Sequence, residues 1–141
     1  MTDKKLVMKK LSELEECVGA LEKMRKYDIA AIKSDKEKEW AVEHGLQVSI
    51  QIVVDIGAHI LASSGEGDVE DYAEIIERLG KKGVLPKDFA TRIKGMAGFR
   101  NILVHEYAKL DMDLVCDMLK NRLDDFRKFA RHVSKYMEGI G

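Results

Sequence analysis

Apolar residues recur at spacings of three and four along the whole chain, and this periodicity constrains its fold more than any other feature. Near the N-terminus, Val7, Leu11, Leu14, Val18 and Leu21 fall on one side of a helix. No segment alternates apolar and polar residues as a half-buried strand does. The 141 residues include one proline, and no long stretch rich in glycine, proline or serine separates two domains. We therefore expect one all-α domain over residues 1–141, folded as an antiparallel helical bundle.

Five helices account for the pattern, and we expect them at residues 3–25, 34–62, 69–80, 86–110 and 111 to the chain end. Ser34 and Glu37 have the spacing of a capping box that opens the second helix, and Gly80 is placed to end the third. Gly95 and Gly98 each cost a helix roughly 1 kcal/mol relative to alanine. Their position just before Arg100 predicts a close helix approach or a local distortion.

Several classes of protein are disfavoured. Cys17 and Cys116 lie within helical patterns without a Cys-x-x-Cys motif, so we expect packing residues and neither a zinc site nor a disulfide. No N-terminal segment resembles a signal peptide. The most apolar run, Leu46 to Ala62, is too polar for a membrane span because it contains Gln47, Gln51, Asp55 and His59. We expect a cytoplasmic protein without a cofactor.

The fourth helix carries a polar stripe on the side away from its core face. Arg100, Asn101, His105 and, at the margin, Tyr107 share this stripe, since Tyr107 falls about 20° from the direction of Arg100. The opposite side is apolar and consists of Met96, Phe99, Ile102 and Leu103. A guanidinium, an imidazole and a phenol on one stripe can act on a phosphate, so the stripe is a candidate site.

The second helix is apolar on two sides, with a polar column between them that contains His44, Gln47, Gln51 and Asp55. One explanation is a helix that lies partly in a subunit interface, with Gln51 and Asp55 facing a cleft shared with the fourth helix. The other explanation is a solvent-exposed stripe. The sequence leaves both open.

Charge is distributed unevenly although the net charge is only −1. Residues 1–80 hold 11 Lys/Arg and 17 Asp/Glu, a net charge of −6, whereas residues 81–141 hold 13 and 8, a net charge of +5. The basic residues of the second half cluster on the fourth and fifth helices, where they could guide a phosphate backbone. The alternative is a set of ordinary solvated faces.

The string Arg100-Asn101, three residues, His105, one residue and Tyr107 resembles the R-N-x-x-x-H-x-Y signature of HepT-like toxins of the HEPN superfamily. The likeness covers most of the chain, including Gln51 and Asp55 on the second helix. It implies a homodimer whose cleft joins two copies of the motif, metal-independent endoribonuclease activity and a minimal nucleotidyltransferase antitoxin as partner. It also implies that the antitoxin attaches AMP to Tyr107.

The residue types suit this chemistry. An imidazole titrates near neutral pH, so His105 can take a proton from a ribose 2′-hydroxyl or give one to the leaving oxygen. The planar guanidinium of Arg100 can stabilise negative charge on the phosphate oxygens. Asn101 can orient His105 or donate to the phosphate, and Tyr107 can bind substrate or be a core tyrosine. The stripe has too few carboxylates to hold Mg²⁺, so we expect no metal.

Two other functional classes remain possible from the sequence. One is a non-catalytic nucleotide-binding or scaffolding HEPN domain that accompanies a nucleotidyltransferase. The other is a helical interaction protein without a small-molecule site. The presence of both Arg100 and His105 favours the ribonuclease. We assign no function to His44, His59 and His132.

Overall fold

The computed structural model describes residues 3–69, 71–104 and 111–139, with backbone alone at positions 101, 102 and 104. These residues form seven helices and no strand, which confirms the all-α class. The helices are α1 (Lys4–Met24), α2 (Ile29–Lys33), α3 (Lys36–Ser63), α4 (Tyr72–Lys82), α5 (Lys87–Val104), α6 (Met112–Asn121) and α7 (Leu123–Gly139).

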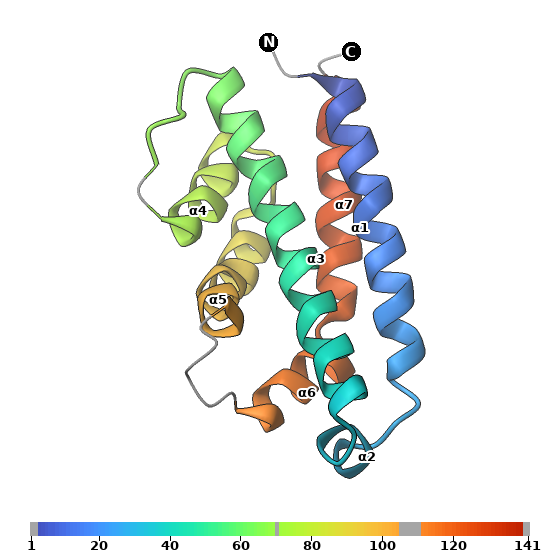
Figure 1. Ribbon diagram of the computed structural model, residues 1–141. Coiled ribbons are helices and arrows are strands. Elements are labelled where there is room, and N and C mark those ends of the chain that lie inside the picture. Colours follow the sequence, from blue (N-terminus) through green and yellow to red (C-terminus); the bar gives the residue numbers. More distant parts are fainter. Residues whose placement is uncertain (1–2, 70, 105–110, 140–141) are drawn as a thin grey trace.

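Helix α3 lies in the middle of the bundle (Figure 1). On one side α1 and α7 run beside it, and α1 is antiparallel to both; on the other side α4 and α5 pack against it (Figure 1). Short helices α2 and α6 lie together at the end of the bundle opposite the chain termini (Figure 1). The expected seam of α1 is confirmed, because its five apolar residues are at most 7% exposed. Each such burial stabilises the fold by roughly 1.5–3 kcal/mol.

Two helix boundaries differ from the sequence expectation. Asp35, and not Ser34, caps α3: its Oδ1 accepts the Glu37 N–H at 3.0 Å and the Lys38 N–H at 3.4 Å. Ser34 instead ends α2, a helix that the sequence analysis missed. Helix α4 continues through Gly80 and ends at Gly83, which has a φ of +87°. Gly80 is needed for packing, because a Cβ there would lie 2.8 Å from the Cβ of Ala90 on α5.

The predicted fifth helix is two helices, α6 and α7, which are separated at Arg122. Asp125, in the first turn of α7, is only 1% exposed and binds two arginines. Its Oδ1 accepts from Arg92 Nε at 3.0 Å, and its Oδ2 accepts from Arg122 Nε at 2.8 Å. A buried carboxylate is stable only when paired in this way. The pairs tie α5 to the junction of α6 and α7.

The prediction of close packing at Gly95 and Gly98 is wrong. Both residues are exposed, a Cβ at either would meet no atom of the described residues within 4 Å, and α5 is continuous through them. They instead line a groove between α5 and α6, together with the charged residues Arg92, Asp117 and Arg122. Met96, Phe99, Leu114 and Met118 contribute to its lining.

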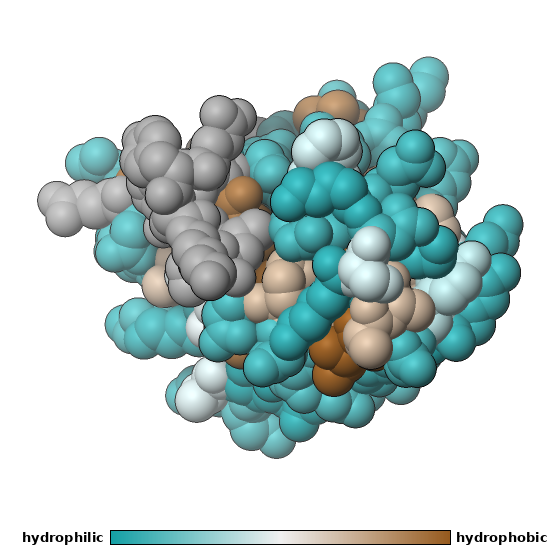
Figure 2. Space-filling view, turned by 60° about the horizontal axis from the view of Figure 1, so that its bottom comes forward, coloured by the Kyte–Doolittle hydropathy of each residue, from teal (hydrophilic) through white to brown (hydrophobic). Residues whose placement is uncertain are grey.

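The two apolar sides of α3 are both covered within the chain, which removes the reason for placing a subunit interface there. Val42, Leu46, Ile50 and Ile60 are buried on one side, and Ile52 and Ile56 are at most 6% exposed on the other. By length and composition α3 could cross a membrane, but such an apolar helix is also typical of a soluble core, and these residues are packed inside the bundle. At the α2 and α6 end, apolar side chains form small, separate patches among hydrophilic ones (Figure 2).

Candidate functional site

Arg100 on α5 is joined to α3 through a chain of two hydrogen bonds. Its Nε–H donates to Oε1 of Gln51 at 2.8 Å, although the two residues are 49 positions apart. The side-chain amide of Gln51 then donates to Oδ1 of Asp55, also at 2.8 Å. This part of the polar column on α3 therefore faces α5. His44, at the start of the column, is exposed and makes no hydrogen bond or ion pair within the described part of the chain.

Tyr72, the first residue of α4, provides a second contact to the same guanidinium. The Cζ of Arg100 lies 5.0 Å from the centre of the Tyr72 ring, within cation–π range. Three helices therefore meet at Arg100. The sequence gives no sign of this contact, because a tyrosine on an amphipathic helix does not reveal its partner locally.

Among the described residues, these contacts hold the guanidinium without using its outer nitrogens. The side-chain oxygen of Gln51 accepts from Nε of Arg100. Within the described residues no acceptor binds Nη1 or Nη2 of Arg100. The side chain is half-buried, so water has partial access to it. Two terminal nitrogens in one plane carry four N–H donors, the geometry that binds two oxygens of a phosphate.

The structure describes little of the other three residues of the motif. His105 and Tyr107 fall outside the described residues, as does the side chain of Asn101. Helix α5 extends through Val104, so it reaches the residue directly before His105. The predicted core face is confirmed at Met96, Phe99 and Leu103, which are 5%, 7% and 8% exposed.

Within the described residues, no histidine or cysteine side chain bonds to Arg100. His59 accepts the backbone N–H of Asp3 at 3.2 Å, and His132 packs on the ring of Phe89. Burial raises the pKa of the Cys17 and Cys116 thiols, which disfavours nucleophilic thiolates at neutral pH. Within residues 3–69, 71–104 and 111–139, no three His, Cys, Asp or Glu side chains are arranged to hold a metal ion.

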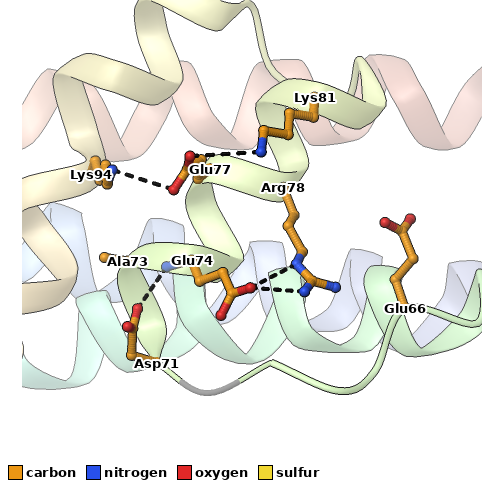
Figure 3. A pocket seen from close by; sticks show the side chains of 8 residues that line it. All are labelled: Glu66, Asp71, Ala73, Glu74, Glu77, Arg78, Lys81 and Lys94. Carbon is orange, nitrogen blue, oxygen red and sulfur yellow. Dashed lines mark hydrogen bonds and ion pairs between the residues drawn. The ribbon is translucent and has the colours of Figure 1, made fainter.

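A groove between α4 and α5 is lined by charged side chains that neutralise one another (Figure 3). Arg78 donates to Glu74 at 2.8 and 3.1 Å. Glu77 lies between Lys81 at 3.8 Å and Lys94 at 3.3 Å. Because opposite charges are already paired here, this groove is a poor candidate for a charged ligand.

Comparison with known proteins identifies the family. The family model described as Ribonuclease HepT-like matches residues 14–133, which is most of the chain. The chain belongs to this HepT-like family. The resemblance inferred from the Arg100 motif is thereby confirmed.

Two HepT-like relatives are nucleases by name. The mRNA nuclease HepT of Shewanella oneidensis is 24% identical over 124 residues, which cover 88% of this chain and 92% of that protein. The tRNA nuclease HepT of Aphanizomenon flos-aquae is 29% identical over 117 residues, which cover 83% and 80%. The two names thus refer to two different classes of RNA, mRNA and tRNA.

Solved structures have the same fold as this HepT-like chain. The tri-AMPylated HEPN toxin of Shewanella oneidensis, solved with its MNT antitoxin, superposes with a TM-score of 0.83 at 24% identity, covering 96% of this chain and 99% of that one. YutE of Bacillus subtilis, a cytosolic protein of unknown function, gives 0.85 at 18% identity, covering 99% and 93%. These likenesses support the helical HEPN-like fold.

Proposed function

We propose that this HepT-like protein is an endoribonuclease toxin of a toxin–antitoxin pair and that Arg100 and His105 carry its chemistry. The observation that supports this most is the arrangement of Arg100. Gln51 and Tyr72 hold its guanidinium from two other helices, while its outer nitrogens have no partner in the described part of the chain. A purely structural arginine would be expected to use those nitrogens in ion pairs, as Arg127 does with Glu22.

The proposed reaction needs no metal. His105 removes the proton of the ribose 2′-hydroxyl, whose oxygen attacks the adjacent phosphorus. The bond from phosphorus to the 5′-oxygen breaks, and that oxygen takes a proton as it leaves. Arg100 stabilises the charge that builds on the non-bridging oxygens, and the product carries a 2′,3′-cyclic phosphate. In this proposal Asn101 orients His105 or the phosphate, and Asp55 holds the amide of Gln51.

A homodimer would supply a second histidine, so that one copy removes a proton and the other donates one. Since the apolar sides of α3 are covered, we place the interface on the groove between α5 and α6, beside Gly95 and Gly98. Leu114 there is 41% exposed. A permanent interface should bury about 2,000 Å² or more. Sedimentation at micromolar concentration should show a dimer that Leu114→Glu weakens; a wild-type monomer would contradict this part of the proposal.

Control by a partner is the remaining part of the proposal. A relative has been solved in a tri-AMPylated form with an MNT antitoxin. We propose that a minimal nucleotidyltransferase likewise attaches AMP to Tyr107 of this chain and silences it. We also propose a cytoplasmic location, where RNA and such a partner are both present.

Growth and RNA cleavage test the central proposal. Expression of the wild-type chain should arrest growth, and Arg100→Ala and His105→Ala should each abolish the arrest and the cleavage of RNA in vitro. His44→Ala is the matched control, because His44 is exposed and has no partner among the described residues. Folded Arg100→Ala and His105→Ala variants that still cleave would overturn the assignment. A wild-type chain that binds a nucleotidyltransferase but cleaves no RNA would indicate the non-catalytic alternative.

A further inference from the structure

A second groove lies where the α4–α5 connection packs beside α7, at the end of α5 away from Arg100. Val84 and Leu85 form part of its floor and are only 3% and 1% exposed. Lys81 and Lys87 line it from one side, and His132, Lys135 and Tyr136 from α7. Its volume of about 570 Å³ is within the usual range for small-molecule sites.

The groove is complementary to negative charge. Lysines line it from both sides, and among the described residues no carboxylate contributes to its lining. Lys81 lies 3.8 Å from Glu77, but Lys87 and Lys135 are exposed and form no ion pair with any described residue. This is the opposite of the groove in Figure 3, where four carboxylates accompany the basic residues.

Rings beside the lysines favour a nucleic acid over an acidic peptide. Tyr136 is half-buried, and the His132 ring is held by Phe89, with the ring centres 5.2 Å apart and the planes tilted by 51°. Aromatic faces beside a basic groove are the usual arrangement for binding single-stranded nucleic acid, since every base can stack on them. An acidic peptide would require only the lysines.

The basic surface continues from the groove along α7. Lys128 and Arg131 lie one helical turn before His132 and Lys135, respectively. Both are exposed, and neither forms an ion pair in the described part of the chain. From Lys128 to Lys135 the helix rises about 10 Å, so this row can follow several phosphates of one strand.

We propose that this groove binds single-stranded RNA outside the cleavage site, with a base stacked on Tyr136 and neighbouring phosphates held by Lys87 and Lys135. The proposal rests on the ribonuclease function proposed above and concerns its substrate. Lys87 and Arg100 are separated by about 20 Å along α5. At about 3.4 Å per stacked nucleotide the axial distance alone corresponds to roughly six nucleotides. The two residues also point about 140° apart around the helix, so the RNA that reaches both places must be longer.

Binding is tested in a His105→Ala background, so that the RNA stays intact. A fluorescent 12-nucleotide single-stranded RNA should bind about tenfold more weakly to Lys87→Glu/Lys135→Glu, since two phosphate contacts become repulsions. The slope of log affinity against log salt should fall by about 1.4, because each lost contact removes about 0.7. Lys9→Glu/Lys23→Glu on α1 is the charge-matched control and should bind normally, since both lysines are exposed and without ion pairs among the described residues.

Tyr136 is tested by a matched pair. Tyr136→Phe keeps the aromatic face and should bind as before, whereas Tyr136→Leu should lose about fivefold or more in affinity. In chains that retain His105, the groove variants should raise KM for the 12-nucleotide RNA without changing kcat, and cleavage of a trinucleotide should be unaffected.

The outcomes separate this inference from the proposed function. If the wild-type chain binds RNA through the groove but cleaves none, the ribonuclease proposal fails and the groove assignment stands. Normal RNA binding by folded Lys87→Glu/Lys135→Glu overturns the groove assignment. If the Lys87→Glu/Lys135→Glu variant binds RNA normally but no longer binds the antitoxin, the groove is a protein-binding surface instead.

Discussion

The guanidinium of Arg100 donates its Nε–H to the side-chain oxygen of Gln51 at 2.8 Å, across 49 positions of sequence. Gln51 thus binds Nε alone, and among the described residues neither outer nitrogen has an acceptor. Gln51 is itself held by Asp55, so the orientation of Arg100 depends on a chain of three side chains.

Gln51→Leu should lower kcat by about ten- to a hundredfold, because a hydrogen bond to a charged group is typically worth about 1.5–3 kcal/mol. The fold should persist, since Gln51 is only partly buried. Steady-state cleavage measures the loss, and Gln47→Leu, one turn earlier on the same column, should remain active. Equal rates for the two variants would show that Gln51 does not position Arg100.

Tyr72→Leu should reduce cleavage about two- to fivefold, the loss expected from a cation–π contact of about 0.5–1 kcal/mol. Tyr72→Phe keeps the ring face and should retain the wild-type rate. Single-turnover measurement is suitable, because it isolates the chemical step. Equal cleavage rates for Tyr72→Phe and Tyr72→Leu would show that the ring face has no effect on Arg100.

Asp125→Ala should destabilise the fold by about 2–3 kcal/mol, because the buried carboxylate accepts from Arg92 and Arg122. Both arginines are partly exposed and can be rehydrated, which limits the loss. Urea unfolding measures the effect, and the exposed neighbour Asp124→Ala should change stability by no more than about 0.5 kcal/mol.

RNA cleavage should survive EDTA and yield 2′,3′-cyclic phosphate ends, since the proposed chemistry uses only His105 and Arg100. Product ends can be identified by mass spectrometry of the cleaved oligonucleotide. Activity that EDTA abolishes and Mg²⁺ restores would require a different catalytic apparatus.

Incubation with the partner nucleotidyltransferase and ATP should add one or more AMP units to the wild-type chain and none to Tyr107→Phe. The added phosphate places negative charge near Arg100 and should exclude the substrate. Intact-mass spectrometry gives the number of units. An unmodified wild-type chain that is nevertheless fully inhibited would mean that the antitoxin acts by occlusion.

The sequence by itself determined the helical class, the buried seam of α1 and the core face of α5, because each follows from the spacing of apolar residues along a single helix. It also identified the Arg100 motif as a string of neighbours on one segment. Boundaries were less accurate: Asp35 caps α3, and α4 runs past Gly80, because competing caps and stops differ only by their surroundings.

Only the tertiary structure decided which elements meet at the site. The contacts of Arg100 with Gln51 and Tyr72 join three helices, and no local pattern specifies which polar side chain faces which partner. The same holds for the junction at Arg122, where Asp125 is buried between arginines of two helices. The spacing of apolar residues shows which side of a helix is apolar or polar. Which other helix covers that side depends on the packing of the whole bundle.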